Sequence, residues 1–194
     1  MNPDTARAIS LLGHPLAVLP VAAMLLAGKQ GAAAQAAWIG AGLLAFAVLV
    51  LAGSWRQVRA GRWAHVDASE PHERRTLNLW LLCAMAPGAA VAWWQGNGVL
   101  AAGLGVSAGV ILVALLLARW CKLSLHVAFA VLATMMVSEA WPWAGLVGVV
   151  FACLVAWSRL VLQRHRPRDL VVGALAGSVA GLVFLLASRA LDAG

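Results

Sequence analysis

Residues 98–119 read GVLAAGLGVSAGVILVALLLAR, a run whose one charged side chain stands at its last position. About 20 mostly apolar residues are needed for a helix to cross ~30 Å of hydrocarbon. This stretch meets that requirement, and it predicts a helix that spans a membrane.

The composition of the whole chain points to the same environment. The 194 residues are 63% hydrophobic and 11% charged, with a mean hydropathy of +0.88. A soluble domain is about 45–50% apolar and about 25% charged, so a soluble fold would leave far more apolar surface than its charges can cover. The bilayer is therefore the expected solvent.

Six further apolar runs are long enough to cross a membrane, and they lie at residues 8–27, 33–53, 77–96, 123–140, 142–163 and 168–188. We predict an all-α integral membrane protein, a helical bundle of about seven transmembrane spans, or six if one end span does not cross. Pro87 and Gly88 are expected to interrupt the third span. Residues 1–194 contain no linker, low-complexity tail or internal repeat, which favours a single transmembrane domain.

Charge is distributed unevenly between the two sides of this predicted bundle. With seven spans, 12 of the 14 Lys and Arg residues lie on the side of the N-terminus, and only Lys29 and Arg189 lie on the other. The positive-inside rule makes the first side cytoplasmic. The net charge of +7 is thus interpreted as a topology signal, with no nucleic-acid partner. The alanine-rich, lysine-poor composition favours a multi-pass protein of a bacterial inner membrane, with no cleaved signal peptide.

Cofactor sites are not indicated. The three cysteines, Cys83, Cys121 and Cys153, have no CxxC spacing, so neither a disulfide framework nor a zinc site is predicted. No cluster of carboxylates suits a metal ion. We expect no metal and no other cofactor.

The most informative polar stretch runs from residue 158 to 169 and reads SRLVLQRHRPRD. Pro167 is tolerated only in the first turn of a helix, so the last span should begin near residue 166. Residues at i and i+4 share a helix face, so Asp169 is expected to hold one ring nitrogen of His165. The free amides of that helix start favour an anion beside His165. The alternative is a basic loop that only anchors two spans.

Two other segments lie on the same side. Residues 122–126 read KLSLH, in which Ser124 can cap a helix and His126 lies just inside the interface; a lone histidine there is more often structural. Residues 67–76 read DASEPHERRT and by themselves indicate a solvated loop, the interpretation we prefer for His65 and His72.

Arg74 and Arg75 are singled out because they share a side with both histidine segments. His14, which stands alone before Pro15, is interpreted as a helix-packing residue.

The three segments resemble the motifs of the type-2 phosphatidic-acid phosphatase family over about residues 67–185. The third family motif, Ser-Arg-x5-His-x3-Asp, is complete at Ser158, Arg159, His165 and Asp169.

The other two family motifs match only in part. The second, Pro-Ser-Gly-His, is represented by Ser124 and His126, with leucine at the Pro and Gly positions. The first, a Lys followed after six residues by Arg-Pro, is represented only by Arg74 or Arg75, and no lysine precedes them at the family's spacing.

This resemblance implies roles for individual residues. His165 would attack phosphorus and form a phosphohistidine, and Asp169 would orient it and stabilise its charge. His126 would protonate the leaving oxygen and then activate water. The phosphate-binding residues would be Arg159, Arg74 or Arg75, Ser124 and Ser158, with Lys122 in place of the missing lysine.

We therefore predict a metal-independent phosphatase that acts on the phosphate or diphosphate ester of a membrane lipid. Polyprenyl (di)phosphate, phosphatidic acid and phosphatidylglycerol phosphate are all candidate substrates. One alternative is a catalytically impaired relative that binds a lipid phosphate or a partner protein. A transporter or channel ranks last because ionisable residues inside the spans are scarce. The Gly and Ala residues on the spans permit close packing within one chain or between two copies, so a homo-oligomer stays open.

Overall fold

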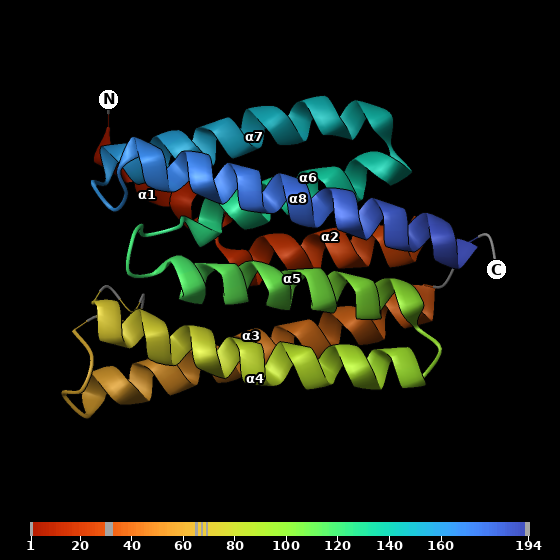
Figure 1. Ribbon diagram of the computed structural model, residues 1–194, viewed down its shortest axis with the longest axis horizontal. Helices are drawn as coiled ribbons and strands as arrows, with labels where there is room; N and C mark the ends of the chain where they lie inside the picture. The colour runs from red at the N-terminus through yellow and green to blue at the C-terminus, as the bar shows by residue number, and fades with distance from the viewer. Residues whose placement is uncertain (1, 30–32, 65, 67, 69, 193–194) are drawn as a thin grey trace.

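The computed structural model describes residues 2–29, 33–64, 66, 68 and 70–192, and these residues form eight helices (Figure 1). The helices are α1 (Pro3–Leu12), α2 (Pro15–Lys29), α3 (Ala33–Arg59), α4 (Pro71–Trp94), α5 (Gly98–Leu117), α6 (Leu125–Ala140), α7 (Pro142–Val161) and α8 (Pro167–Asp192). From α2 to α8 they alternate in direction along the long axis of the molecule. One end of the bundle, here called the histidine end, carries α1 and the connections α3–α4, α5–α6 and α7–α8.

Five of these helices, α3, α4, α5, α7 and α8, are long and apolar enough to cross a membrane. The α1–α2 pair qualifies as a sixth span if it is taken as one bent unit. These helices make the chain a multi-pass membrane protein. The predicted all-α membrane bundle is confirmed. Of the predicted spans, the run at 123–140 is the one that falls short of this criterion, because α6 has only 16 residues. At 1.5 Å per residue, α6 is about 24 Å long, less than the ~30 Å of the hydrocarbon core.

Two predictions about helix continuity were wrong. The run at 8–27 is not one straight helix, because α1 and α2 meet at an angle of 47°. The break falls just before Pro15, which suits the first position of a new helix because it has no N–H to satisfy. Conversely, α4 continues through Pro87 to Trp94. Transmembrane helices tolerate such prolines when neighbouring groups satisfy the freed backbone atoms.

The outer surface of the bundle is apolar. Large side chains on the outer faces are more than half exposed, including Leu44, Leu49, Leu116, Leu146 and Leu186. A soluble monomer rarely exposes so much continuous apolar area, whereas lipid chains cover it at no cost. This surface agrees with the multi-pass assignment.

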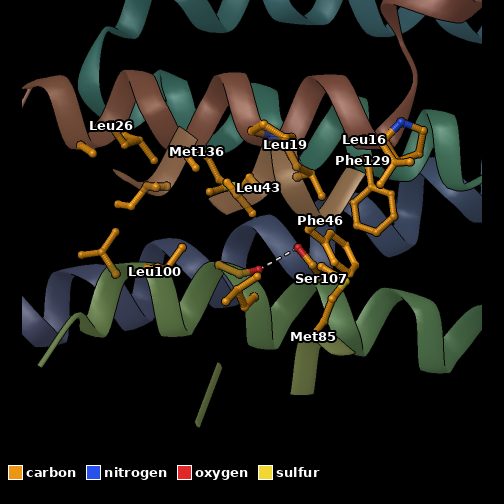
Figure 2. A pocket seen from close by; sticks show the side chains of 18 of the residues that line it. Leu16, Leu19, Leu26, Leu43, Phe46, Met85, Leu100, Ser107, Phe129 and Met136 are labelled. Atoms are coloured by element: carbon orange, nitrogen blue, oxygen red, sulfur yellow. Dashed lines mark hydrogen bonds between the residues drawn. The ribbon is translucent and has the colours of Figure 1, made fainter. Parts of the chain in front are cut away.

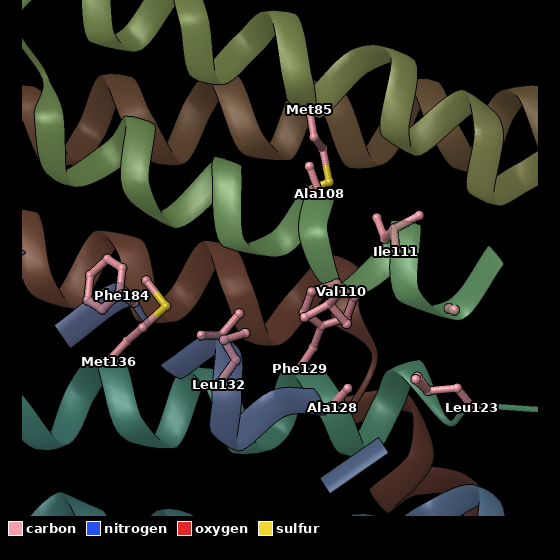
Figure 3. Close-up of a cluster of buried hydrophobic side chains, with 12 residues drawn as sticks. Met85, Ala108, Val110, Ile111, Leu123, Ala128, Phe129, Leu132, Met136 and Phe184 are labelled. Carbon is pink, nitrogen blue, oxygen red and sulfur yellow. The ribbon is translucent and has the colours of Figure 1, made fainter. Parts of the chain in front are cut away.

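Helix α6 lies in the middle of the bundle. Its Phe129, Leu132 and Met136 form the main buried cluster with Ile111 of α5 and Phe184 of α8 (Figure 3). Neighbouring helices enclose α6, so most of its surface does not contact lipid despite its short length.

Helix α8 packs against α6 through a row of glycines at i, i+4 and i+8, namely Gly173, Gly177 and Gly181. A Cβ atom at Gly173 would lie 2.6 Å from the carbonyl oxygen of Ser124, and one at Gly177 would overlap the carbonyl oxygen of Ala128. Only glycine permits this approach of two helix backbones. The contact brings the first turns of α6 and α8 together at the histidine end.

Candidate functional site

His165 lies in the α7–α8 connection, directly before the first turn of α8. Its ring is 6% exposed, and its Nδ1 lies 3.0 Å from the backbone carbonyl oxygen of Lys122. A carbonyl only accepts hydrogen bonds, so this contact assigns the proton of the neutral ring to Nδ1. The lone pair is then on Nε2, the nitrogen available for chemistry.

Asp169 joins two segments of the chain at this point. Its carboxylate, 4% exposed, accepts from the N–H of Arg166 at 3.0 Å and from the N–H of Lys122 at 3.2 Å. Its Oδ2 lies 3.9 Å from Nδ1 of His165, which is an ion-pair distance but too long for a hydrogen bond. The expected hydrogen bond from the ring N–H to Asp169 is therefore absent, and the Lys122 carbonyl accepts from the ring instead.

Arg159 projects from the last turn of α7. Its Nη1 donates to the hydroxyl of Ser10 on α1 at 2.7 Å, so the short N-terminal helix helps to orient the guanidinium group. The neighbouring Ser158 is fully buried and donates to the carbonyl of Val155 at 2.7 Å. Its hydroxyl is therefore used within α7.

His126 lies in the first turn of α6 and contacts His14 edge-on, with ring centroids 5.1 Å apart and an interplanar angle of 86°. His14 stands at the α1–α2 break, where its Nδ1 accepts from the N–H of Leu16 at 3.2 Å. Because Nδ1 accepts, the neutral His14 ring carries its proton on Nε2. His14 is thus more than the packing residue that its isolated position in the sequence suggested.

Arg74 and Arg75 belong to the first turn of α4. The buried Glu73 anchors this turn by accepting from the N–H of Glu70 at 3.0 Å and from the N–H of Ala64. Arg74, half-buried, interacts electrostatically with Glu70, Glu73 and Asp169. The exposed His72 points away from this region, in agreement with its interpretation as a solvated residue. His65 and Asp67 lie outside the described residues.

These elements enclose a polar cavity at the histidine end, here called the cationic cavity. Its polar wall is made by His14, Ser54, Arg74, Arg75, Asn78, Lys122, His126, Arg159, Arg164 and His165. Six predicted site residues therefore meet in one place, although they come from three separate segments.

Three predicted site residues are not in the wall of the cationic cavity: Asp169, Ser124 and Ser158. Ser124 is fully buried and faces Gly173, and its hydroxyl has no hydrogen-bond partner in the described part of the chain. In this arrangement neither Ser124 nor Ser158 lines the cavity, so their predicted phosphate contacts stay a prediction. His14, Asn78 and Arg164 are wall residues that the sequence did not single out.

The cavity is strongly positive. Its described wall holds five Lys and Arg side chains and no carboxylate. Burial, with the nearby charges of Arg74, Arg159 and Arg164, lowers the pKa of Lys122. An anion in the cavity would relieve this repulsion, and guanidinium groups suit the oxygens of a phosphate or carboxylate.

His165 is held in its neutral form. Burial, with the charges of Arg159 and Lys122, lowers its pKa to about 4, although the Lys122 carbonyl and Asp169 act in the opposite direction. A neutral imidazole with a lone pair on Nε2 is a nucleophile at neutral pH. The site thus combines a cationic wall with a neutral imidazole whose lone pair is on Nε2.

No described group of three His, Cys, Asp or Glu side chains is arranged to hold a metal ion. Comparisons of the chain with protein-family models, curated proteins and solved structures found no match.

Proposed function

We propose that this chain is a membrane-bound phosphatase that hydrolyses the phosphate ester of a lipid through a phosphohistidine at His165, without a metal ion. The observation that carries the proposal is a neutral, buried His165 in a cavity whose charged wall residues are all cationic. The apolar exterior of the bundle supports this proposal, because a cavity at one end of a membrane-embedded bundle would lie within reach of lipid head groups.

The first step forms the covalent intermediate. Nε2 of His165 attacks phosphorus, and the bond from phosphorus to the lipid oxygen breaks. A phosphate anion bound in the cavity offsets the positive charge of Arg159 near His126, so this ring can enter the step as an imidazolium and give its proton to the leaving oxygen. The products of this step are a lipid alcohol and a phosphohistidine.

The second step returns the enzyme to its starting state. His126 takes a proton from water as the water oxygen attacks phosphorus, and the phosphorus–nitrogen bond breaks with its electron pair returning to Nε2. Inorganic phosphate leaves. His14, in edge contact with His126, is placed to orient that ring during both proton transfers.

The charged residues support these steps without reacting themselves. Arg159, Arg74, Arg75 and Lys122 line the cavity in which the phosphate oxygens would lie, and fixed donors of this kind stabilise charge that develops in the transition state. Asp169, 3.9 Å from Nδ1 of His165, stabilises the positive ring of the phosphohistidine.

The experiment that tests the proposal is phosphate release by purified protein in detergent from a panel of lipid monophosphates and diphosphates. His165→Ala is expected to abolish release. The matched control is His72→Ala, because His72 is exposed and outside the cavity. The proposal is wrong if no lipid phosphate is hydrolysed by folded wild-type protein, or if His165→Ala retains full activity.

Two observations favour a second function. The hydroxyl of Ser124 is turned away from the cavity, and the ring of His165 lacks a direct hydrogen bond to Asp169. A protein that binds a lipid phosphate but does not cleave it needs neither contact. Trapping of radiolabelled phosphate on His165 after rapid acid quench would exclude this alternative.

On the proposed assignment, the lipid is a constituent of a bacterial inner membrane. The excess of Lys and Arg at the histidine end supports a site on the cytoplasmic face, by the positive-inside rule. This orientation is tested by labelling Cys121, in the α5–α6 connection, with a membrane-impermeant thiol reagent in intact and opened vesicles. Since Cys83 and Cys153 also carry free thiols, they are replaced by serine in that experiment.

A further inference from the structure

A second cavity, almost entirely apolar, lies deeper in the bundle between the α2–α3 pair and the α4–α5 pair (Figure 2). Leu19 and Leu26 of α2, Leu43 and Phe46 of α3, and Leu100 of α5 point into it. Its polar wall groups are largely satisfied by their own helix: Ser107 donates to the carbonyl of Gly103 at 2.7 Å, and Asn97 accepts from the N–H of Leu100. Such a cavity does not attract water and is filled best by an apolar ligand.

The apolar cavity adjoins the cationic cavity. Four residues, Pro15, Leu16, Leu81 and Phe129, belong to the walls of both. Pro15 directly follows His14, and Phe129 lies about one turn from His126 on α6. A molecule with an anionic end at His165 and an apolar body can therefore occupy both spaces.

The length of the apolar cavity follows from its wall. On α2 the wall extends from Leu16 to Leu26, and on α5 from Val99 to Ile111, which correspond to about 15 and 18 Å of helix. An extended chain advances about 1.2 Å per bond, the value for an extended polypeptide. The cavity therefore has the length of about 12–15 bonds.

We propose that the apolar cavity binds the hydrocarbon chain of the lipid whose phosphate lies at His165, and that a stretch of this chain of up to about 12–15 carbon atoms lies inside the cavity. The identity of the head group rests on the proposed function. The cavity is bounded by helices on most sides, so it holds one chain, and a second chain of the same lipid would remain in the bilayer.

The test is photolabelling with dodecyl phosphate that carries a diazirine at the end of its chain, followed by peptide mapping. A dodecyl chain reaches about 14 Å from the phosphate, so the label is expected on the middle of the cavity wall, near Leu19 of α2 and Leu104 of α5. Leu43→Trp fills the cavity and is expected to reduce this label at least tenfold. Its matched control is Leu44→Trp, because the neighbouring Leu44 is 64% exposed on the outer face of the same helix and its replacement should leave the label unchanged.

A second variant guards against misfolding. Leu100→Phe fills the cavity from α5, and each variant must keep the wild-type elution volume and melting temperature to be compared. Label on outward residues such as Leu44 or Leu186, or equal labelling of Leu43→Trp and Leu44→Trp, would overturn the inference.

Labelling does not require hydrolysis, so the two proposals fail separately. Label inside the cavity without phosphate release from any substrate leaves the chain-binding site standing and removes the phosphatase. Phosphate release with label only on the outer surface removes the chain-binding site and leaves the phosphatase.

Discussion

Two contacts between helices in this bundle are built in opposite ways. At the α6–α8 contact, Gly173 and Gly177 bring two backbones so close that a single added carbon would overlap the facing backbone, and Gly181 packs equally tightly against the side chain of Met135. At the contact between α2–α3 and α4–α5, leucine and phenylalanine side chains face one another across an open apolar cavity. The same bundle thus contains one seam without free space and one with space for a ligand.

The tight seam holds groups in fixed positions, whereas the open seam leaves space for a ligand. The tight seam carries the hydrogen bonds that join the α5–α6 connection to the start of α8, including that from the N–H of Ser124 to the carbonyl of Asp169 at 3.1 Å. Groups that must be placed within a fraction of an ångström benefit from such a rigid support. The open seam has no comparable set of polar contacts to maintain, and its walls can adapt to a chain.

The largest effect is expected from Arg159, which the structure places beside the tight seam. Arg159→Ala should lower kcat/KM for the best lipid phosphate by about 10²–10³-fold, the usual effect of removing one fixed donor from a transition-state site. Arg159→Lys should recover part of the loss, since it keeps the charge but not the planar fork. Steady-state phosphate release measures both, and equal activity of all three proteins would contradict the role of Arg159.

The tight seam itself is tested by Gly177→Leu. Overpacking costs about 1–3 kcal/mol or more, so thermal unfolding in detergent should shift to lower temperature and phosphate release should fall with it. Gly109→Leu is the control, because nothing lies within 4 Å of a Cβ at that position of α5. If both variants melt at the same temperature, the α6–α8 contact is not the rigid element described above.

A smaller effect on kcat/KM is expected from lowering the pH. Because the pKa of His165 is lowered to about 4, the nucleophile stays neutral from pH 7 down to about pH 5, and kcat/KM should fall tenfold per pH unit only below about pH 4. Arg159→Gln removes a positive neighbour, so it should raise that pKa and move the acid limb to higher pH. A wild-type limb centred at pH 6.5, the ordinary histidine value, would show that the site does not suppress protonation.

The smallest effect is expected from Ser124→Ala. The Ser124 hydroxyl is buried, lies outside the cationic cavity and has no partner among the described residues, so its removal should change phosphate release less than about threefold and leave stability equal or slightly higher. A loss of tenfold or more would show that Ser124 turns toward the phosphate in the working enzyme, as the family resemblance implies.

The ends of the long helices were predictable because charge and hydropathy change sharply there. The predicted spans 98–119 and 142–163 correspond to α5 and α7 within two residues. The break before Pro15 was missed because Gly13 and His14 sit inside an otherwise apolar run, where average hydropathy hides a change of direction. The predicted interruption at Pro87 was wrong because a proline inside a lipid-embedded helix does not have to end that helix.

The site was predictable to the extent that it depends on which end of each helix a residue occupies. Arg74, His126, Arg159 and His165 meet because alternating helices bring their segments to the same end of the bundle. The direction of a side chain depends on the rotation of each helix about its axis, which spacing along the chain does not determine. For that reason Ser124 turned out to face Gly173, and His14, interpreted as a packing residue, turned out to face the cavity.

The hydrogen bond between His165 and residue 122 has a consequence for genetics. Its acceptor is a main-chain oxygen, so every amino acid at position 122 supplies the same group, and codon changes there alter the ammonium charge while leaving the ring orientation intact. A mutational scan would therefore detect the effect of the Lys122 charge and would not detect the hydrogen bond that its main-chain oxygen accepts. Replacing that peptide bond by chemical synthesis is the way to expose it.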